Sequence, residues 1–179
     1  HLATAGRRIM EVAGARPDWR LLNMFPYAPH LAFWLTHYAS TEFGVFSVGT
    51  GGGKVMGTDG NLRLVQKIKP DVLIGMPTFL YHLLQSAVEE GVRCETLKRL
   101  VLGGEKAAEG MRRKLRNLCA KLGSPGVDVV ATYGFTAAKI AWTACPFAVD
   151  DTPTGYHLYP DLGIVEVVEI PASNGAPTH

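Results

Sequence analysis

One glycine-containing segment, Tyr133-Gly134-Phe135-Thr136, has the residue types that a nucleotide site needs. It follows a mostly apolar run at 127–131, so it is expected at the end of a strand. An aromatic ring at such a place offers a flat face on which a purine can stack. Gly134 permits close approach to the backbone, and the Thr136 hydroxyl can donate to a phosphate oxygen. The alternative is a turn in which the aromatic ring only fills space.

A second candidate, Gly103-Gly104-Glu105, directly follows the apolar strand expected at 99–102. Two adjacent glycines let backbone groups approach a flat ligand and pair with the edge of a base. The alternative is an ordinary strand-to-helix turn, in which Glu105 stabilises the positive N-terminus of the helix that follows.

Other chemistries find less support in the sequence. The glycine-rich loop 49–54 fits no phosphate template: Val55 follows Lys54 where a Walker loop has Ser or Thr, and Lys54 stands where a dinucleotide fingerprint has its third glycine. We therefore interpret 49–54 as a flexible or closely packed loop. No G-x-S-x-G or H-E-x-x-H motif occurs, so a motif-based hydrolase is not indicated.

Metal and nucleic-acid sites are also disfavoured. Cys145 and His157 could supply two metal ligands, whereas zinc usually takes four, so we expect no metal site. The basic residues of the helix expected at 107–122, Arg112 among them, are predicted to lie opposite its apolar stripe without interleaved aromatics. This pattern is typical of a solvated face, and we expect no nucleic-acid partner.

The composition is that of a globular chain. Of 179 residues, 47% are hydrophobic and 19% charged, and the net charge is only +2. No apolar stretch approaches the ~20 residues that span a bilayer, so no membrane span is expected. The three cysteines form no C-x-x-C pair, which favours a reducing compartment and hence a cytoplasmic location.

The hydrophobic pattern predicts an α/β fold with a mostly parallel sheet flanked by helices. Short apolar strands alternate with amphipathic helices up to residue 131, which is typical of a parallel sheet covered on both faces. Three consecutive strands are then expected at 140–145, 155–159 and 163–170, as a short antiparallel extension at the C-terminal end. Ligands of such sheets bind at the carboxyl ends of the strands, where the two candidate segments are placed.

The order and spacing of these segments resemble the adenylate-forming (AMP-forming) acyl-CoA synthetases, most closely the phenylacetate–CoA ligase group. That family has a G-G-E segment, then an M-R-containing helix, and then a Y-G-x-[ST]-E segment. The matching stretches, which reach over nearly the whole chain, are Asp71–Thr78, Gly103–Glu105, Met111-Arg112, Tyr133–Thr136, Gly155–Asp161 and Val165–Val167.

The resemblance implies a nucleotide site. Gly103, Gly104 and Glu105 would border the adenine and the acyl pocket. Tyr133 would stack on the adenine, and Gly134 would pass close to it.

The same resemblance implies one catalytic contact and a substrate loop. Thr136 would contact the α-phosphate, where charge builds as the carboxylate attacks. Tyr27 and its neighbour His30 match a loop that lines the acyl pocket. The implied reaction converts a carboxylic acid and ATP, with Mg²⁺, to an acyl-adenylate, from which coenzyme A then displaces AMP.

The chain departs from the family in three places. Ala137 stands where the motif has a Glu that helps to hold Mg²⁺. The phosphate loop would precede residue 1, and the ribose-binding Asp and the C-terminal domain with its catalytic Lys would follow residue 179. We therefore expect residues 1–179 to be a central part of an N-terminal adenylation domain that is inactive as a ligase by itself.

Three functional hypotheses remain open at this point, of which the third is an unrelated α/β binding domain. The first is a fragment of an AMP-forming carboxylate–CoA ligase, with an aryl acid as one candidate substrate. The second, motivated by Ala137, is a non-catalytic nucleotide- or acyl-binding module on the same scaffold. The sequence does not decide between coenzyme A and a carrier protein as acceptor, and it leaves the oligomeric state open, with a homodimer as one option.

Overall fold

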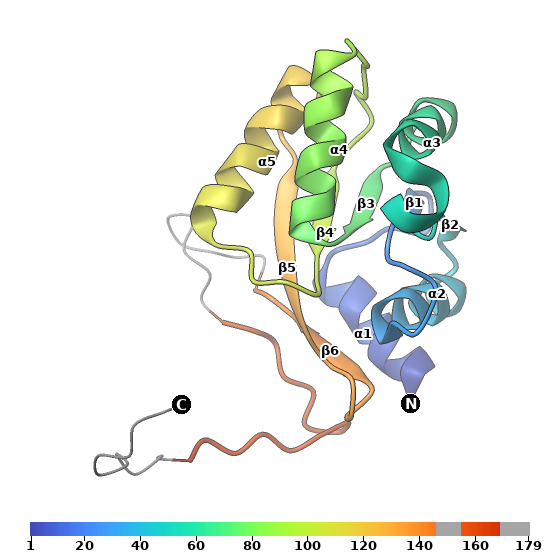
Figure 1. Cartoon of the computed structure of the whole chain (residues 1–179). Helices are drawn as coiled ribbons and strands as arrows, with labels where there is room; N and C mark the ends of the chain where they lie inside the picture. The colour runs from blue at the N-terminus through green and yellow to red at the C-terminus, as the bar shows by residue number, and fades with distance from the viewer. Residues whose placement is uncertain (146–154, 169–179) are drawn as a thin grey trace, which may run out of the picture.

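The protein is described here by a computed structural model, in which residues 1–145 and 155–168 are placed (Figure 1). Its centre is a six-stranded sheet of order β2-β1-β3-β4-β5-β6. The strands are β1 Arg20–Asn23, β2 Phe46–Gly49, β3 Val72–Gly75, β4 Arg99–Leu102, β5 Asp128–Phe135 and β6 Ile140–Thr143. The first five run parallel, and β6 pairs antiparallel with the second half of β5. The predicted fold class is confirmed.

Five helices accompany these strands in the described ranges: α1 Leu2–Val12, α2 Leu31–Phe43, α3 Gly53–Ile68, α4 Pro77–Glu89 and α5 Glu109–Lys121. Their ends follow local chemistry. Pro77 occupies the first turn of α4, where its missing N–H costs nothing, and Gly44 ends α2 with a φ of 77°. Helix α3 begins at Gly53 and is interrupted at Gly57, where φ is 65°.

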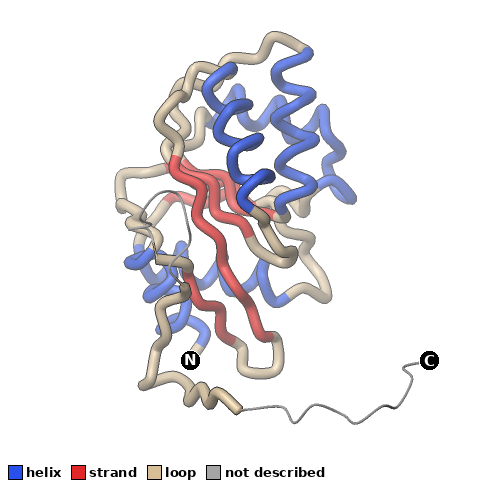
Figure 2. Tube along the Cα trace, turned by 90° about the vertical axis from the view of Figure 1, so that its left-hand side faces the viewer, coloured by secondary structure: helices blue, strands red, loops and turns tan. Residues whose placement is uncertain are grey.

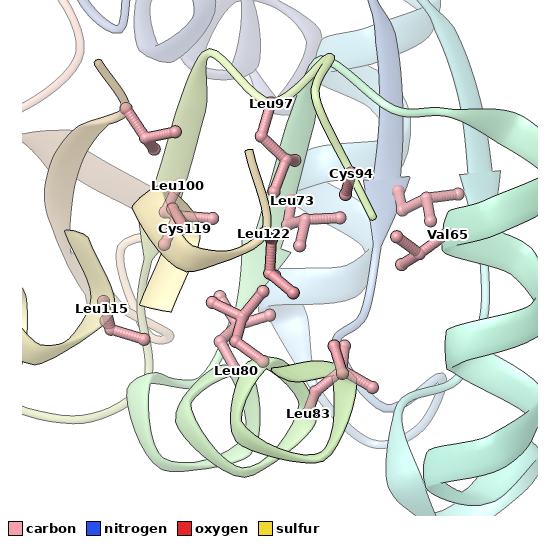
Figure 3. Packing of buried hydrophobic residues seen from close by; sticks show 14 of the residues in the cluster. Val65, Leu73, Leu80, Leu83, Cys94, Leu97, Leu100, Leu115, Cys119 and Leu122 are labelled. Carbon is pink, nitrogen blue, oxygen red and sulfur yellow. The ribbon is translucent and has the colours of Figure 1, made fainter. Parts of the chain in front are cut away.

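The helices cover both faces of the sheet, as the turned view in Figure 2 shows. Side chains of successive strand residues point to opposite faces. Leu22 and Leu73 accordingly pack with α3, α4 and α5, whereas Leu21 and Val72 pack with α1 and α2. Figure 3 shows the first of these cores, in which fully buried Leu80 lies close to the strands. Each such leucine contributes about 1.5–3 kcal/mol by burial.

The antiparallel extension is shorter than expected. Only its first strand forms, as β6. Residues 155–159 contribute one isolated bridge, between Ala144 and Tyr156, and 163–168 form no strand. Val167 in that segment is 98% exposed, because no neighbouring strand in the described part of the chain offers it a partner. The prediction of strands at 155–159 and over 163–168 was wrong, and 169–170 lie outside the described residues.

The basic helix α5 differs from expectation at one position. Arg112 is only 7% exposed, although it was predicted to lie on a solvated face. Arg116 on the same helix pairs with Glu109 at 3.3 Å. The charge pattern thus described the helix surface correctly for most positions but did not predict this buried guanidinium.

No helix within the described ranges combines the length and the apolar character needed to cross a bilayer.

Candidate functional site

A cavity of about 630 Å³ lies between the sheet and the helices α1 and α2. It brings together residues from segments that are far apart in the sequence. The predicted site residues that line it are His30, Gly103, Gly104, Glu105, Tyr133, Gly134 and Thr136. Its middle is apolar, with Val72, Ile74 and Val101 from the sheet.

The loop after β4 is held tightly against β5. A Cβ at Gly103 would lie 2.7 Å from the Thr132 hydroxyl oxygen and 3.2 Å from a ring carbon of Phe25. That hydroxyl is fixed, since it donates a hydrogen bond of 2.9 Å to the Leu102 carbonyl. Gly104 has a φ of 81°, which favours glycine. Gly103 is therefore required by the local packing, and Gly104 is favoured by its backbone conformation, whether or not a ligand is bound.

Glu105 has a structural partner that the sequence did not reveal. Its carboxylate accepts hydrogen bonds from the Thr78 amide at 3.2 Å and from the Thr78 hydroxyl at 2.9 and 2.8 Å. Thr78 lies in the first turn of α4, where an anion is favoured by the helix dipole. Glu105 thus stabilises the start of α4, not the start of α5 that directly follows it. The contact also ties the glycine loop to a neighbouring helix.

Tyr133 is held by other aromatic rings but keeps an accessible surface. Its ring stacks on Trp142, its cross-strand partner in β6, with centroids 5.7 Å apart and planes 13° apart. Tyr156 approaches with its centroid at 6.1 Å. Because 56% of Tyr133 is still exposed at the cavity, the ring is both positioned and able to contact a ligand.

The tip of the β5–β6 hairpin carries Thr136 and Ala137. Thr136 lines the cavity, and its carbonyl accepts a hydrogen bond from the Lys139 amide at 3.1 Å. Lys139 has a left-handed φ of 53°, which closes the turn. Ala137 is exposed and supplies no oxygen ligand from its side chain. The described residues contain no group of three or more His, Cys, Asp or Glu that could hold a metal ion.

The structure separates the two residues of the expected substrate loop. His30 lines the cavity. The Tyr27 hydroxyl instead donates to the Gly49 carbonyl at 2.9 Å, and its ring meets Phe33 edge-on with centroids 4.8 Å apart. Tyr27 is not among the cavity-lining residues and packs against the glycine loop that follows β2.

Residues that the sequence did not single out also line the cavity: Trp19, Phe25, Arg99 and Tyr156. Arg99 opens the otherwise apolar strand β4, and a charged residue at such a position is itself a signal that could have been noticed. Away from the cavity, burial raises the pKa of the Cys119 thiol to about 12, so it is no nucleophile at neutral pH.

Comparison with known proteins confirms the resemblance to acyl-CoA ligases. The chain is 25% identical over 164 residues to a phenylacetate-coenzyme A ligase of Thermus thermophilus, covering 90% of this chain and 34% of that protein. It is 25% identical over 171 residues to a medium-chain-fatty-acid–CoA ligase of Ectopseudomonas oleovorans, covering 92% and 28%. The chain thus spans about a third of the length of these curated relatives. No protein-family model matches it.

The fold is shared with solved ligase structures. A 2-hydroxyisobutyryl-CoA ligase crystallised with 2-HIB-AMP and CoA superimposes with a TM-score of 0.64 at 22% identity. The match covers 73% of this chain and 27% of that one. At this identity the similarity establishes the architecture and not the activity.

Proposed function

We propose that this chain is the part of an AMP-forming carboxylate–CoA ligase that binds the adenosine and the acyl group. The observation that carries the proposal is the convergence of the loop after β4 and the hairpin after β5 on one cavity. Both segments reach this cavity because β4 and β5 are parallel neighbours, so that the chain leaves both strands at the same edge of the sheet. The similarity to a phenylacetate ligase and a fatty-acid ligase supports a carboxylic acid as the substrate class.

In this proposal each group has a role set by its chemistry. The exposed face of Tyr133 stacks on the adenine, while the glycines of the β4 loop let the base edge reach the backbone. The carboxylate of the acid attacks the α-phosphate of ATP, which gives an acyl-adenylate and releases pyrophosphate. The Thr136 hydroxyl donates to the α-phosphate oxygen on which charge develops. Coenzyme A then displaces AMP and forms the thioester.

The side chains at the hairpin tip do not fit a magnesium ion. Mg²⁺ prefers carboxylate oxygens and water, and Ala137 offers no carboxylate. Lys139, two positions on, carries the same sign of charge as the ion. We therefore assign no step to the metal, and we expect the 179 residues alone to show no ligase activity.

Ala137 also favours a second function. A chain that keeps Tyr133 and the glycine loop but lacks the metal carboxylate can bind a nucleotide without activating an acid. We propose this non-catalytic binding module as the alternative. The three cysteines, all unpaired, support a cytoplasmic location for either function.

Calorimetry with AMP on the full chain tests the shared part of both functions. Replacing Tyr133 by Leu removes the stacking face and is expected to weaken AMP binding about tenfold. The matched control is Tyr38→Leu, since Tyr38 is a similarly exposed tyrosine on α2 outside the cavity. Equal losses in both variants, or no AMP binding by the wild-type chain, would remove the proposed nucleotide site.

ATP–pyrophosphate exchange separates the two functions. We expect none from the 179-residue chain, and exchange at the rate of a complete ligase would refute that expectation. In a longer protein that contains this chain, exchange supports the ligase. AMP binding without exchange there supports the non-catalytic module.

A further inference from the structure

A second tyrosine, Tyr156, lies beside Tyr133 in the wall of the cavity. Both residues line the cavity, and their ring centroids are 6.1 Å apart with planes inclined by 51°. Tyr156 is 47% exposed and Tyr133 is 56% exposed, so each side chain keeps a surface that a ligand in the cavity can contact. We call this pair of inclined rings the aromatic corner.

The backbone of Tyr156 is fixed to the end of the β5–β6 hairpin. Tyr156 forms an antiparallel bridge with Ala144, which directly follows β6. A hydrogen bond of 2.9 Å, from the His157 amide to the Thr143 carbonyl, accompanies this bridge. The position of Tyr156 is therefore set by the same hairpin that carries Tyr133.

The residue between the two tyrosines is small. Trp142 is the cross-strand partner of Tyr133, and Ala144 lies two positions later on the same face. Tyr156 stands opposite Ala144, so its side chain belongs to that face as well. Ala144 is buried and carries only a methyl group. Its small size leaves the Tyr156 ring room to approach Tyr133.

The inclination of the rings gives each of them a different contact with a bound base. Trp142 stacks on the Tyr133 ring with planes 13° apart, which holds that ring in place. A base that stacks on Tyr133 meets Tyr156 at its own edge, an arrangement that aromatic rings favour. A bicyclic purine extends farther beyond one phenol ring than a monocyclic pyrimidine does. A purine can therefore contact both rings, whereas a pyrimidine on Tyr133 contacts that ring alone.

We propose that Tyr156 is a second base-contacting residue and that the aromatic corner selects purine nucleotides over pyrimidine nucleotides. This inference rests on the proposed function, which places the base on Tyr133. Tyr156 is then a specificity-determining residue, because it contacts the part of the base that only a purine has. The glycines of the β4 loop approach the same base through their backbone groups.

Calorimetry with AMP and with CMP on the full chain tests the proposal. We expect AMP to bind about tenfold more tightly than CMP, since contact of a base with an aromatic side chain is worth about that factor. Tyr156→Leu should weaken AMP binding about five- to tenfold and change CMP binding by less than about twofold. Tyr133→Leu should weaken the binding of both nucleotides. Equal affinities of AMP and CMP for the wild-type chain would overturn the proposal.

Further variants assign the preference to the Tyr156 ring. Tyr156→Phe keeps the ring and should keep the preference for AMP. Tyr38→Leu, on α2 outside the cavity, is the control and should leave both affinities unchanged. A preference for AMP that survives in folded Tyr156→Leu, or one that is lost in Tyr156→Phe, would also overturn the proposal. Circular dichroism establishes that each variant is folded.

Failure of this inference is distinguishable from failure of the proposed function. AMP binding that is weakened in Tyr133→Leu but unchanged in Tyr156→Leu would reject the role of Tyr156 and retain the nucleotide site. No AMP binding by the wild-type chain would reject the nucleotide site, and the aromatic corner with it.

Discussion

Replacing Gly103 by alanine tests the close contact between the β4 loop and β5. The added methyl group would lie 2.7 Å from the Thr132 hydroxyl oxygen, closer than real side chains approach. The oxygen cannot withdraw without lengthening its 2.9 Å hydrogen bond to the Leu102 carbonyl. On the other side Phe25, at 3.2 Å, limits movement of the loop itself.

The cost can be worked out from these contacts. Overpacking a well-packed site costs about 1–3 kcal/mol, and a lost hydrogen bond about 1 kcal/mol. We therefore expect Gly103→Ala to lower the free energy of unfolding by about 2 kcal/mol, or the melting temperature by about 4–8 °C for a chain of this size. Thr132→Ala removes the clashing oxygen and costs about 1 kcal/mol by itself. The double variant should then lose about 1–1.5 kcal/mol, well below the sum of the two single losses.

Urea unfolding followed by tryptophan fluorescence provides the assay, with a constant m-value as the check that the comparison is valid. Gly110→Ala is the control, because no atom of the described residues beyond its own helix backbone and chain neighbours lies within 4 Å of the added methyl group, and its position is helical. It should leave stability unchanged or slightly raised. A neutral Gly103→Ala, or losses that simply add in the double variant, would refute the steric reasoning.

Three further residues, Cys119, Asp71 and Glu105, give predictions about the fold that supports the site. Since burial raises the pKa of Cys119 to about 12, its thiol should resist a thiol reagent in the folded chain at pH 8, whereas half-buried Cys145 reacts. The pKa of Cys119 is higher in the folded chain than in the unfolded one. Its contribution to the free energy of unfolding is therefore fully present below the unfolded pKa and is lost as the pH rises towards 12. Urea unfolding at a series of pH values measures this loss. Asp71→Ala should lower the free energy of unfolding by about 1–3 kcal/mol in urea titrations, since the backbone N–H that opens β1 loses its buried acceptor. Glu105→Gln should cost about 0.5–1 kcal/mol, and a double-mutant cycle with Thr78→Ala should show coupling, whose absence would contradict the link to α4.

The sheet could be predicted because the residues of its strands are themselves a local pattern typical of buried strands. Strands β3 and β4 are apolar over nearly their full length, as strands covered on both faces must be. The segments 155–159 and 163–168 carry a similar local signal but form no strand. Whether a strand forms depends on a neighbour with free backbone groups, and local alternation contains no information about that neighbour.

The site could be predicted only as far as strand order allows. Gly103 and Thr136 line the same cavity because both lie beyond the carboxyl end of the parallel pairing between β4 and β5, which the sequence pattern indicates. The pairing of Glu105 with Thr78 joins positions in different units of the fold, and no local pattern specifies it. Tyr27 and His30 are near neighbours in one loop, yet only His30 lines the cavity, because Tyr27 hydrogen-bonds to the Gly49 carbonyl.

Strand β5 pairs with two different strands, and these two pairings are expected to form at different times during folding. Its second half forms a hairpin with β6, whose partners are close in the sequence, and hairpins close within about 1–10 μs. Its first half pairs in parallel with β4 across an intervening helix, a non-local contact of the kind that slows folding. Tyr133 and Thr136 can therefore be presented by an early hairpin, whereas Gly103 joins them only when the parallel sheet closes. During synthesis, β4 leaves the ribosome first and must wait, unpaired on that edge, for β5 to complete the cavity.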